Sequence, residues 1–372
     1  MSDSAETELD PDEDEDDGPR SAWREWRRPM VLLGLTFLST FYVGAQSARA
    51  GLTKQWPHET MKWSLIDKPV RAMTHHEMAP FSLEEMQYFL THPEQLLAGW
   101  TFAVPLMLIL IAHEMGHYVA GRIHGVDISP PYFIPMPFFL LGTMGAVIRM
   151  RGRIKTRDAL LDIGAAGPLA GMVVAIPVVI YGLYISRTGT LDQLLPPSLI
   201  DFEGNVFVEG RGLLYLGLIH VLKGPLPEGH DVWLSPWALA GWAGLLVTMI
   251  NLIPIGQLDG GHVAYALFGK RQDTYSRRVH WALPFVGGAV SLAYVIPSYL
   301  AGERGLAELS GEAFAGFHWV FWAFVLVILM RLSGREHPPT GPEPLSPARR
   351  WVAIGTLLLF VLLFMPSWIY VP

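Results

Sequence analysis

The sequence predicts an all-α polytopic membrane protein with about seven transmembrane helices and a membrane-inserted re-entrant hairpin. Two observations predict this fold class. Of the 372 residues, 51% are hydrophobic and only 16% are charged, whereas an ordinary soluble protein carries about 25% charged residues. The apolar residues also gather in segments long enough to cross a bilayer. The absence of cysteine further excludes disulfides and thiolate metal sites, so any metal ligand must be His, Asp or Glu.

The first element, residues 1–28, is expected to be an acidic, disordered cytoplasmic tail. Ten of the 34 acidic residues lie within the first 17 positions. Such a segment has too little apolar surface to offset the entropy of folding. The formal net charge of -7 therefore comes from the tail, and the remainder of the chain is slightly basic.

Seven charge-poor segments follow, each long enough to span about 30 Å of hydrocarbon as a helix. We expect a first transmembrane helix and an outer loop in 29–94, a membrane core in 95–300, and two C-terminal transmembrane helices in 301–372. The seven segments cover approximately residues 30–48, 95–121, 159–185, 232–258, 281–301, 313–330 and 351–371.

An eighth apolar segment, residues 128–148, is expected to form the re-entrant hairpin. Prolines would break a helix that has to satisfy its own backbone in lipid, and this segment has them at positions 130, 131, 135 and 137. A further apolar run at 213–222 is too short to span and is expected to lie at the membrane interface.

The distribution of basic residues predicts the orientation. With seven spans and a cytoplasmic N-terminus, eighteen of the 27 Lys and Arg residues lie on the cytoplasmic side, as the positive-inside rule requires. If 128–148 crossed the membrane, the basic run at 149–157 would face outside. The charges therefore favour the re-entrant hairpin and a cytoplasmic N-terminus. We expect a multi-pass protein of an inner (cytoplasmic) membrane.

The second span contains the motif HEMGH, with His113, Glu114 and His117. Residues four apart share one face of a helix, so the two imidazoles can bind one zinc ion, and Glu114 can reach a water on that metal. An acidic residue inside a membrane helix costs a few kcal/mol on insertion scales and is seldom kept without a function. The motif therefore indicates a zinc site near the cytoplasmic end of this span.

A catalytic zinc usually has three protein ligands, and the best candidate for the third is Asp259 in NLIPIGQLDGGH, residues 251–262. The predicted topology places Asp259 at the cytoplasmic end of the fourth span, at the depth of the two imidazoles.

His262 is expected to face the inner loop rather than the metal. Gly167 and Gly171 have the G-x-x-x-G spacing typical of close helix packing.

Together these motifs resemble the site-2 protease family of intramembrane zinc metalloproteases. The resemblance rests on HEMGH at 113–117 and NLIPIGQLDGG at 251–261, supported by GAAGPLAG at 164–171 and LGTMGAVIRMR at 141–151. It indicates a branch similar to bacterial and chloroplast members without a PDZ domain, because only about 50 residues separate the third and fourth spans.

The resemblance implies one bound Zn²⁺ ion, with His113, His117 and Asp259 as ligands and Glu114 as the catalytic base. Water bound to zinc has a pKa near 7, and Glu114 would take its proton during hydrolysis. Asn251 would hydrogen-bond the substrate backbone or the oxyanion, or instead form a hydrogen bond between helices.

The hairpin would receive an unwound substrate segment as an added strand, with Phe138, Phe139, Gly142 and Gly145 as candidate substrate-binding residues. The implied substrate is a transmembrane protein, such as an anti-sigma factor or another membrane-tethered regulator. The partners would be this protein and the lipid bilayer, with no nucleic acid. Two alternatives remain open: a metal-ion transporter or non-hydrolytic zinc-binding membrane protein, and a catalytically silent scaffold.

Overall fold

The computed structural model describes residues 19–52, 83–137, 139–150, 154–190, 208–302, 313, 315–333, 340–341 and 343–370. Most of the acidic tail and the candidate residue Phe138 lie outside this part of the chain. The fold is mostly helical. Its elements are α1 (Pro19–Leu52), α3 (Leu83–Thr91), α4 (Pro93–Leu97), α5 (Trp100–Ile123), β1 (Tyr132–Pro135), β2 (Thr143–Val147), α6 (Arg157–Ile185), β3 (Arg187–Thr190), β4 (Val208–Glu209), α7 (Leu213–Lys223), β5 (His230–Trp233), α8 (Pro236–Asn251), α9 (Asp259–Phe268), α10 (Arg271–Ala301), α12 (Phe317–Ser333), α13 (Pro347–Leu363) and β6 (Ile369–Tyr370).

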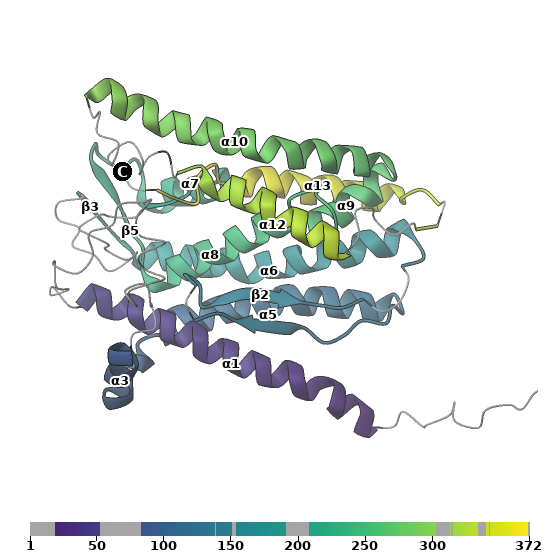
Figure 1. Cartoon of the computed structure of the whole chain (residues 1–372), viewed down its shortest axis with the longest axis horizontal. Helices are drawn as coiled ribbons and strands as arrows, with labels where there is room; N and C mark the ends of the chain where they lie inside the picture. The colour runs from purple at the N-terminus through teal and green to yellow at the C-terminus, as the bar shows by residue number, and fades with distance from the viewer. Residues whose placement is uncertain are drawn as a thin grey trace, which may run out of the picture.

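The long helices run along the longest axis of the molecule (Figure 1). Among the described residues, four helices are long and apolar enough to cross a membrane: Trp23–Gln46, Trp100–Ile123, Arg157–Ile185 and Arg271–Leu300. The protein is therefore a membrane protein. Alongside the helices, the described residues also form three two-stranded sheets, so the fold is mostly rather than entirely helical.

The predicted fourth span, residues 232–258, is divided in the structure. Its first residues belong to β5, and α8 covers only 16 residues before a turn leads to α9. The Ser235 side chain accepts a hydrogen bond from the backbone N–H of Ala238 at 3.2 Å, and a proline follows Ser235 at the first helical position. This cap starts α8 later than the hydropathy pattern suggested.

Helix α6 is the centre of the fold, in contact with α5, α8 and α9. Small residues allow these helices to approach closely. A Cβ atom on Gly116 of α5 would collide with the carbonyl oxygen of Ala166, and one on Gly241 of α8 would lie 2.6 Å from Val179 Cγ2. Because lipid is as apolar as the side chains, this close packing rather than water exclusion holds the membrane-embedded helices together.

The segment predicted as a re-entrant hairpin contains β1 and β2, which pair antiparallel with Tyr132 opposite Val147. The turn between the two strands contacts α1. Gly142 has a φ of +72°, and its carbonyl accepts a hydrogen bond from Ser39 Oγ at 2.6 Å. A Cβ at Gly142 would lie 2.7 Å from Thr40 Cα. Helix α1 therefore holds the hairpin in place beside α5 (Figure 1).

A buried cluster of charged side chains links the segment of β4 to β5, at the end of the bundle that carries β3 and β5 (Figure 1). Arg211 donates to Glu209 Oε1 at 3.0 Å and to Asp231 Oδ1 at 2.6 Å. The Glu209 residue is only 3% exposed. Burial raises the pKa of Glu209 to about 7, even though Arg211 acts in the opposite direction.

This shift predicts a pH-dependent stability. Between pH 4.5 and 7, Glu209 keeps a proton in the folded protein that it has lost in the unfolded chain. Its contribution to the free energy of unfolding is therefore full below pH 4.5 and is lost as the pH rises through 7. A shift of this size corresponds to a contribution on the order of 3 kcal/mol. We expect the thermal midpoint in detergent to fall between pH 5 and 8, and to fall less in Glu209→Gln. Glu228→Gln, at an exposed position of the same connection, is the control. An equal fall in all three proteins would contradict the assignment.

Candidate metal centre

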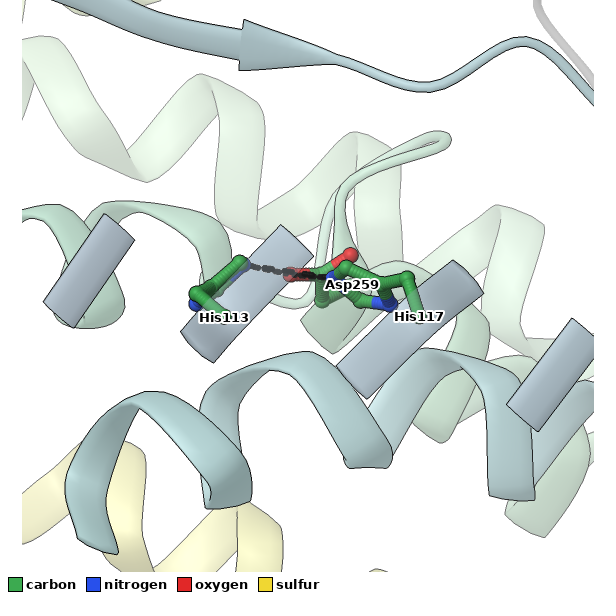
Figure 2. A group of neighbouring side chains, drawn as sticks. All are labelled: His113, His117 and Asp259. Carbon is green, nitrogen blue, oxygen red and sulfur yellow. Dashed lines mark hydrogen bonds and ion pairs between the residues drawn. The ribbon is translucent and has the colours of Figure 1, made fainter. Parts of the chain in front are cut away.

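The structure brings His113, His117 and Asp259 together, although 142 residues separate His117 from Asp259. The two histidines lie one turn apart in α5, and Asp259 is the first residue of α9. Figure 2 shows the three side chains directed toward one another. Both histidines are buried, and the Asp259 side chain is 16% exposed. These are the three residues that the sequence predicts as ligands.

The ligand atoms form a triangle with equal sides. His113 Nε2, His117 Nε2 and Asp259 Oδ2 are each 3.2 Å from the other two. Nitrogen and oxygen atoms bound to a tetrahedral zinc at about 2.05 Å are separated by about 3.3 Å. The donor set and its spacing therefore fit one zinc ion with a fourth position left for another ligand.

A backbone contact orients one of the imidazoles. His117 Nδ1 lies 2.7 Å from the carbonyl oxygen of Ile163 in α6, and because a carbonyl can only accept, Nδ1 is the donor. The proton on Nδ1 leaves the Nε2 lone pair free to face the centre of the triangle. Zinc ligands commonly have such a second hydrogen bond, which sets the tautomer and the ring orientation.

The turn before α9 places Asp259. Helix α8 ends at Asn251, and the chain turns through residues 252–258. A Cβ on Gly260 would collide with the Leu252 carbonyl, and one on Gly261 with the Gly256 carbonyl. Only glycine at these two positions lets the start of α9 pack directly on the turn. The two glycines therefore bring Asp259 to the imidazoles.

The G-x-x-x-G pair in α6 faces the two histidines. A Cβ on Gly167 would collide with the His117 imidazole, and one on Gly171 would lie 3.3 Å from His113 Nδ1. The sequence predicted close helix packing for these glycines. The structure adds that the groups packed against these two glycines are the side chains of the two candidate zinc ligands.

We therefore expect Gly167→Ala to displace His117 and to lower zinc affinity by at least about 10-fold, the lower range seen when the surroundings of a metal ligand are changed. Zinc binding to the purified protein would measure this. The matched control is Gly288→Ala in α10, where a Cβ meets nothing within 4 Å. Unchanged zinc affinity in Gly167→Ala would contradict the prediction.

A cavity of about 340 Å³ opens on the three ligand atoms, and Glu114 also lines it. Asn251 lines the same cavity, with Nδ2 at 3.3 Å from His113 Nε2. The other walls include β2 and the residues that follow it, the turn before α9, and α12. The lining residues are His113, Glu114, His117, Ile128, Ala146, Val147, Ile148, Met150, Ile163, Asn251, Ile255, Gly256, Gln257, Leu258, Asp259, His262, Leu326 and Met330.

His262 was expected to face the inner loop, and this was wrong. It is 6% exposed and lines the cavity. His262 is three residues after Asp259 on α9, and side chains at this spacing lie on nearly the same face of a helix. A Cβ on Gly164 would lie 2.8 Å from the His262 Cβ, so α9 packs tightly on α6 here.

Comparison with known proteins identifies the family. The profile described as Peptidase family M50 matches residues 101–294, which is more than half of the chain and includes every residue of the ligand triangle. This chain belongs to peptidase family M50. No solved structure matches the chain.

Curated relatives of this M50 member include plant proteins. The chain is 30% identical over 271 residues to a probable zinc metalloprotease EGY2, chloroplastic, of Oryza sativa subsp. indica, which covers 73% of this chain and 43% of the relative. It is 28% identical to the EGY2 protein of Arabidopsis thaliana, over 72% of this chain and 41% of the relative. It is also 28% identical to the probable zinc metalloprotease EGY1, chloroplastic, of Arabidopsis thaliana, over 74% of this chain and 46% of the relative. The chain thus spans less than half the length of these relatives.

The structure places the remaining described candidates of this M50 chain, Phe139, Gly142 and Gly145, on the hairpin. Phe139 is 47% exposed at the turn between β1 and β2, and Gly142 packs on α1. Gly145 lies within β2 with a φ of +91°, immediately before Ala146, which lines the cavity. Among these described positions, Gly145 is therefore nearest in sequence to the cavity wall. Substrate binding by all of them stays a prediction.

Proposed function

We propose that this protein is a membrane-embedded zinc endopeptidase that hydrolyses peptide bonds in transmembrane segments of other membrane proteins. The equal-sided triangle of His113, His117 and Asp259, opening on a cavity that Glu114 lines, carries the proposal. Membership of family M50 and the names of the plant relatives, probable zinc metalloproteases, support it.

The chemistry divides between the metal and the chain. A bound zinc ion supplies Lewis-acid polarisation of a carbonyl and lowers the pKa of a water molecule. The His113 and His117 Nε2 atoms and Asp259 Oδ2 would hold it. The Glu114 carboxylate would take a proton from the attacking water and return it to the leaving amine. Asn251 Nδ2, which lies 3.3 Å from His113 Nε2, would donate to a substrate carbonyl.

Strand β2 is the proposed docking edge for the substrate. Within the described part of the chain, β2 pairs only with β1. Its last two residues, Ala146 and Val147, and the following Ile148 line the cavity. A peptide bond inside an intact helix is shielded by hydrogen bonds and side chains, so the substrate has to unwind. An extended segment added to β2 would satisfy its backbone by strand pairing while running past the metal ligands.

The topology that we propose has seven transmembrane helices, with the β1–β2 hairpin inserted as a re-entrant element. Four long apolar helices support it, and α8, α12 and α13 would complete the count. Residues 1–28 would be the cytoplasmic tail, 29–94 the first span and outer loop, 95–300 the protease core, and 301–372 the last two spans. The N-terminus and the metal centre would then lie toward the cytoplasm of a bacterial inner membrane.

The proposed substrates are single-pass membrane proteins, such as an anti-sigma factor or a membrane-tethered regulator. His113 and His117 lie in the second half of α5, on the side that the proposed topology directs to the cytoplasm. A cut there would release the part of the substrate on that side. The lipid bilayer is the second partner.

The test is cleavage of a reporter transmembrane helix by the purified full chain in liposomes. We expect products whose new termini, identified by mass spectrometry, lie within the reporter's transmembrane segment. A chelator should stop cleavage and added Zn²⁺ should restore it. Zinc uptake into the liposomes without cleavage would instead support a transporter and overturn the proposal.

A further inference from the structure

The cavity has one wall that the zinc chemistry does not use. Leu326 and Met330 of α12 line it, although α12 begins at Phe317, beyond the last residue of the family match at 294. Four residues apart on one helix, they share a face. Leu326 is 2% exposed, whereas Phe324 on the same helix is 62% exposed. The face of α12 that carries Leu326 and Met330 is therefore the one directed into the cavity.

Met330 reaches the turn that carries the third ligand. A Cβ at Gly256 would lie 3.5 Å from Met330 Cγ, and Gly256 is three residues before Asp259. Ile255, fully buried, also lines the cavity beside Gly256. Three apolar side chains from α12 and the turn before α9 thus line the same cavity as the candidate metal ligands.

We infer that Ile255, Leu326 and Met330 form an apolar subsite that takes one substrate side chain flanking the scissile bond, and that Met330 sets the size of that side chain. The inference rests on the proposed function. Side chains alternate in direction along an extended substrate, so a strand added at β2 would direct every second side chain to one side of its own plane, and the subsite would receive one of them.

The lining chemistry determines which side chains fit. An amide or carboxylate placed among Ile255, Leu326 and Met330 would lose its water without gaining a hydrogen-bond partner, so polar side chains are disfavoured. Apolar side chains are accepted, and a mismatch in size that the pocket cannot absorb changes the rate about 10-fold or more. Methionine has three flexible torsions, so the wild-type pocket accepts apolar side chains of several sizes.

The experiment uses the zinc-loaded full chain in liposomes and a reporter transmembrane helix whose cleavage site has been located by mass spectrometry. Each of the two residues flanking the cut is changed in turn to Ala, Leu, Phe and Asn, and kcat/KM is measured for every reporter. With the wild type we expect one of the two positions to favour Leu and Phe over Asn by at least about 10-fold. Equal rates for all side chains at both positions would overturn the subsite.

Variants of Met330 test its role in size selection. Met330→Trp should shift the ratio of Ala to Phe cleavage about 10-fold toward Ala, and Met330→Ala should shift it toward Phe. Met330→Leu should keep the wild-type profile. Phe324→Ala, on the opposite side of α12, is the matched control and should change no ratio. Zinc content, measured in each variant, reports an intact metal centre.

The outcomes separate the two proposals. If the Met330 variants change the rates of all reporters by one common factor, the residue is only structural and the subsite is wrong, although the protease function stands. If the zinc-loaded wild type cleaves no reporter at all, the proposed function fails first, and the subsite fails with it.

Discussion

Glu114→Gln should abolish peptide hydrolysis while leaving the metal centre loaded. A positioned general acid and base contributes about 10²–10⁴-fold to a hydrolytic rate, and a neutral amide cannot accept the proton of the attacking water. The ligand triangle consists of His113, His117 and Asp259, so the loss of the carboxylate at position 114 should not remove a zinc ligand. The measurements are reporter cleavage and zinc content of the same purified samples.

The control for this variant is Glu94→Gln in α4, where the glutamate is exposed and outside the cavity lining. It should cleave the reporter at the wild-type rate. Cleavage by Glu114→Gln within a factor of ten of wild type, with zinc bound, would remove Glu114 from the mechanism. Loss of zinc from Glu114→Gln would show instead that the carboxylate belongs to the metal site.

Asp259→Ala should lose both zinc and activity. Two of the three sides of the triangle end at Asp259 Oδ2, and without it the two imidazoles alone would bind the ion. Removing a partner outside the ligand shell already costs about 10–100-fold in affinity, so removing a ligand should cost at least about 100-fold. Competition with a zinc-binding dye would measure the affinity.

Asp127→Ala is the matched control, because Asp127 is an exposed aspartate that follows α5. It should bind zinc as the wild type does. If Asp259→Ala retains wild-type zinc affinity, the third ligand is another residue, and His262, which lines the same cavity, would be the next candidate to substitute.

The helices and most of the candidate site could be predicted from the sequence because both follow local rules. The i, i+4 spacing puts His113 and His117 on one face of any helix, and long apolar segments predict the spans. Asp259 was predicted from its motif together with a topological argument about depth, and the structure places it 3.2 Å from both imidazoles.

Other features depended on long-range packing that no local pattern encodes. The spacing of Gly167 and Gly171 indicated a close helix contact, but it could not indicate that the partner surface is the pair of imidazoles. Hydropathy placed the fourth span over 232–258, whereas capping by Ser235 and the turn after Asn251 shorten α8 to 16 residues. His262 was misplaced because its direction depends on how α9 packs against α6.

The sequence by itself determined the residues available for chemistry: long apolar segments for a helical membrane fold, a candidate ligand set of two His and one Asp in a chain without cysteine, and an acidic residue next to the first candidate ligand. These follow from residue type and spacing along one segment. Only the tertiary structure decided what surrounds that chemistry, including the apolar wall from α12. Leu326 and Met330 meet the turn before Asp259 across more than 60 residues of chain, and only the packing of distant helices brings such residues together.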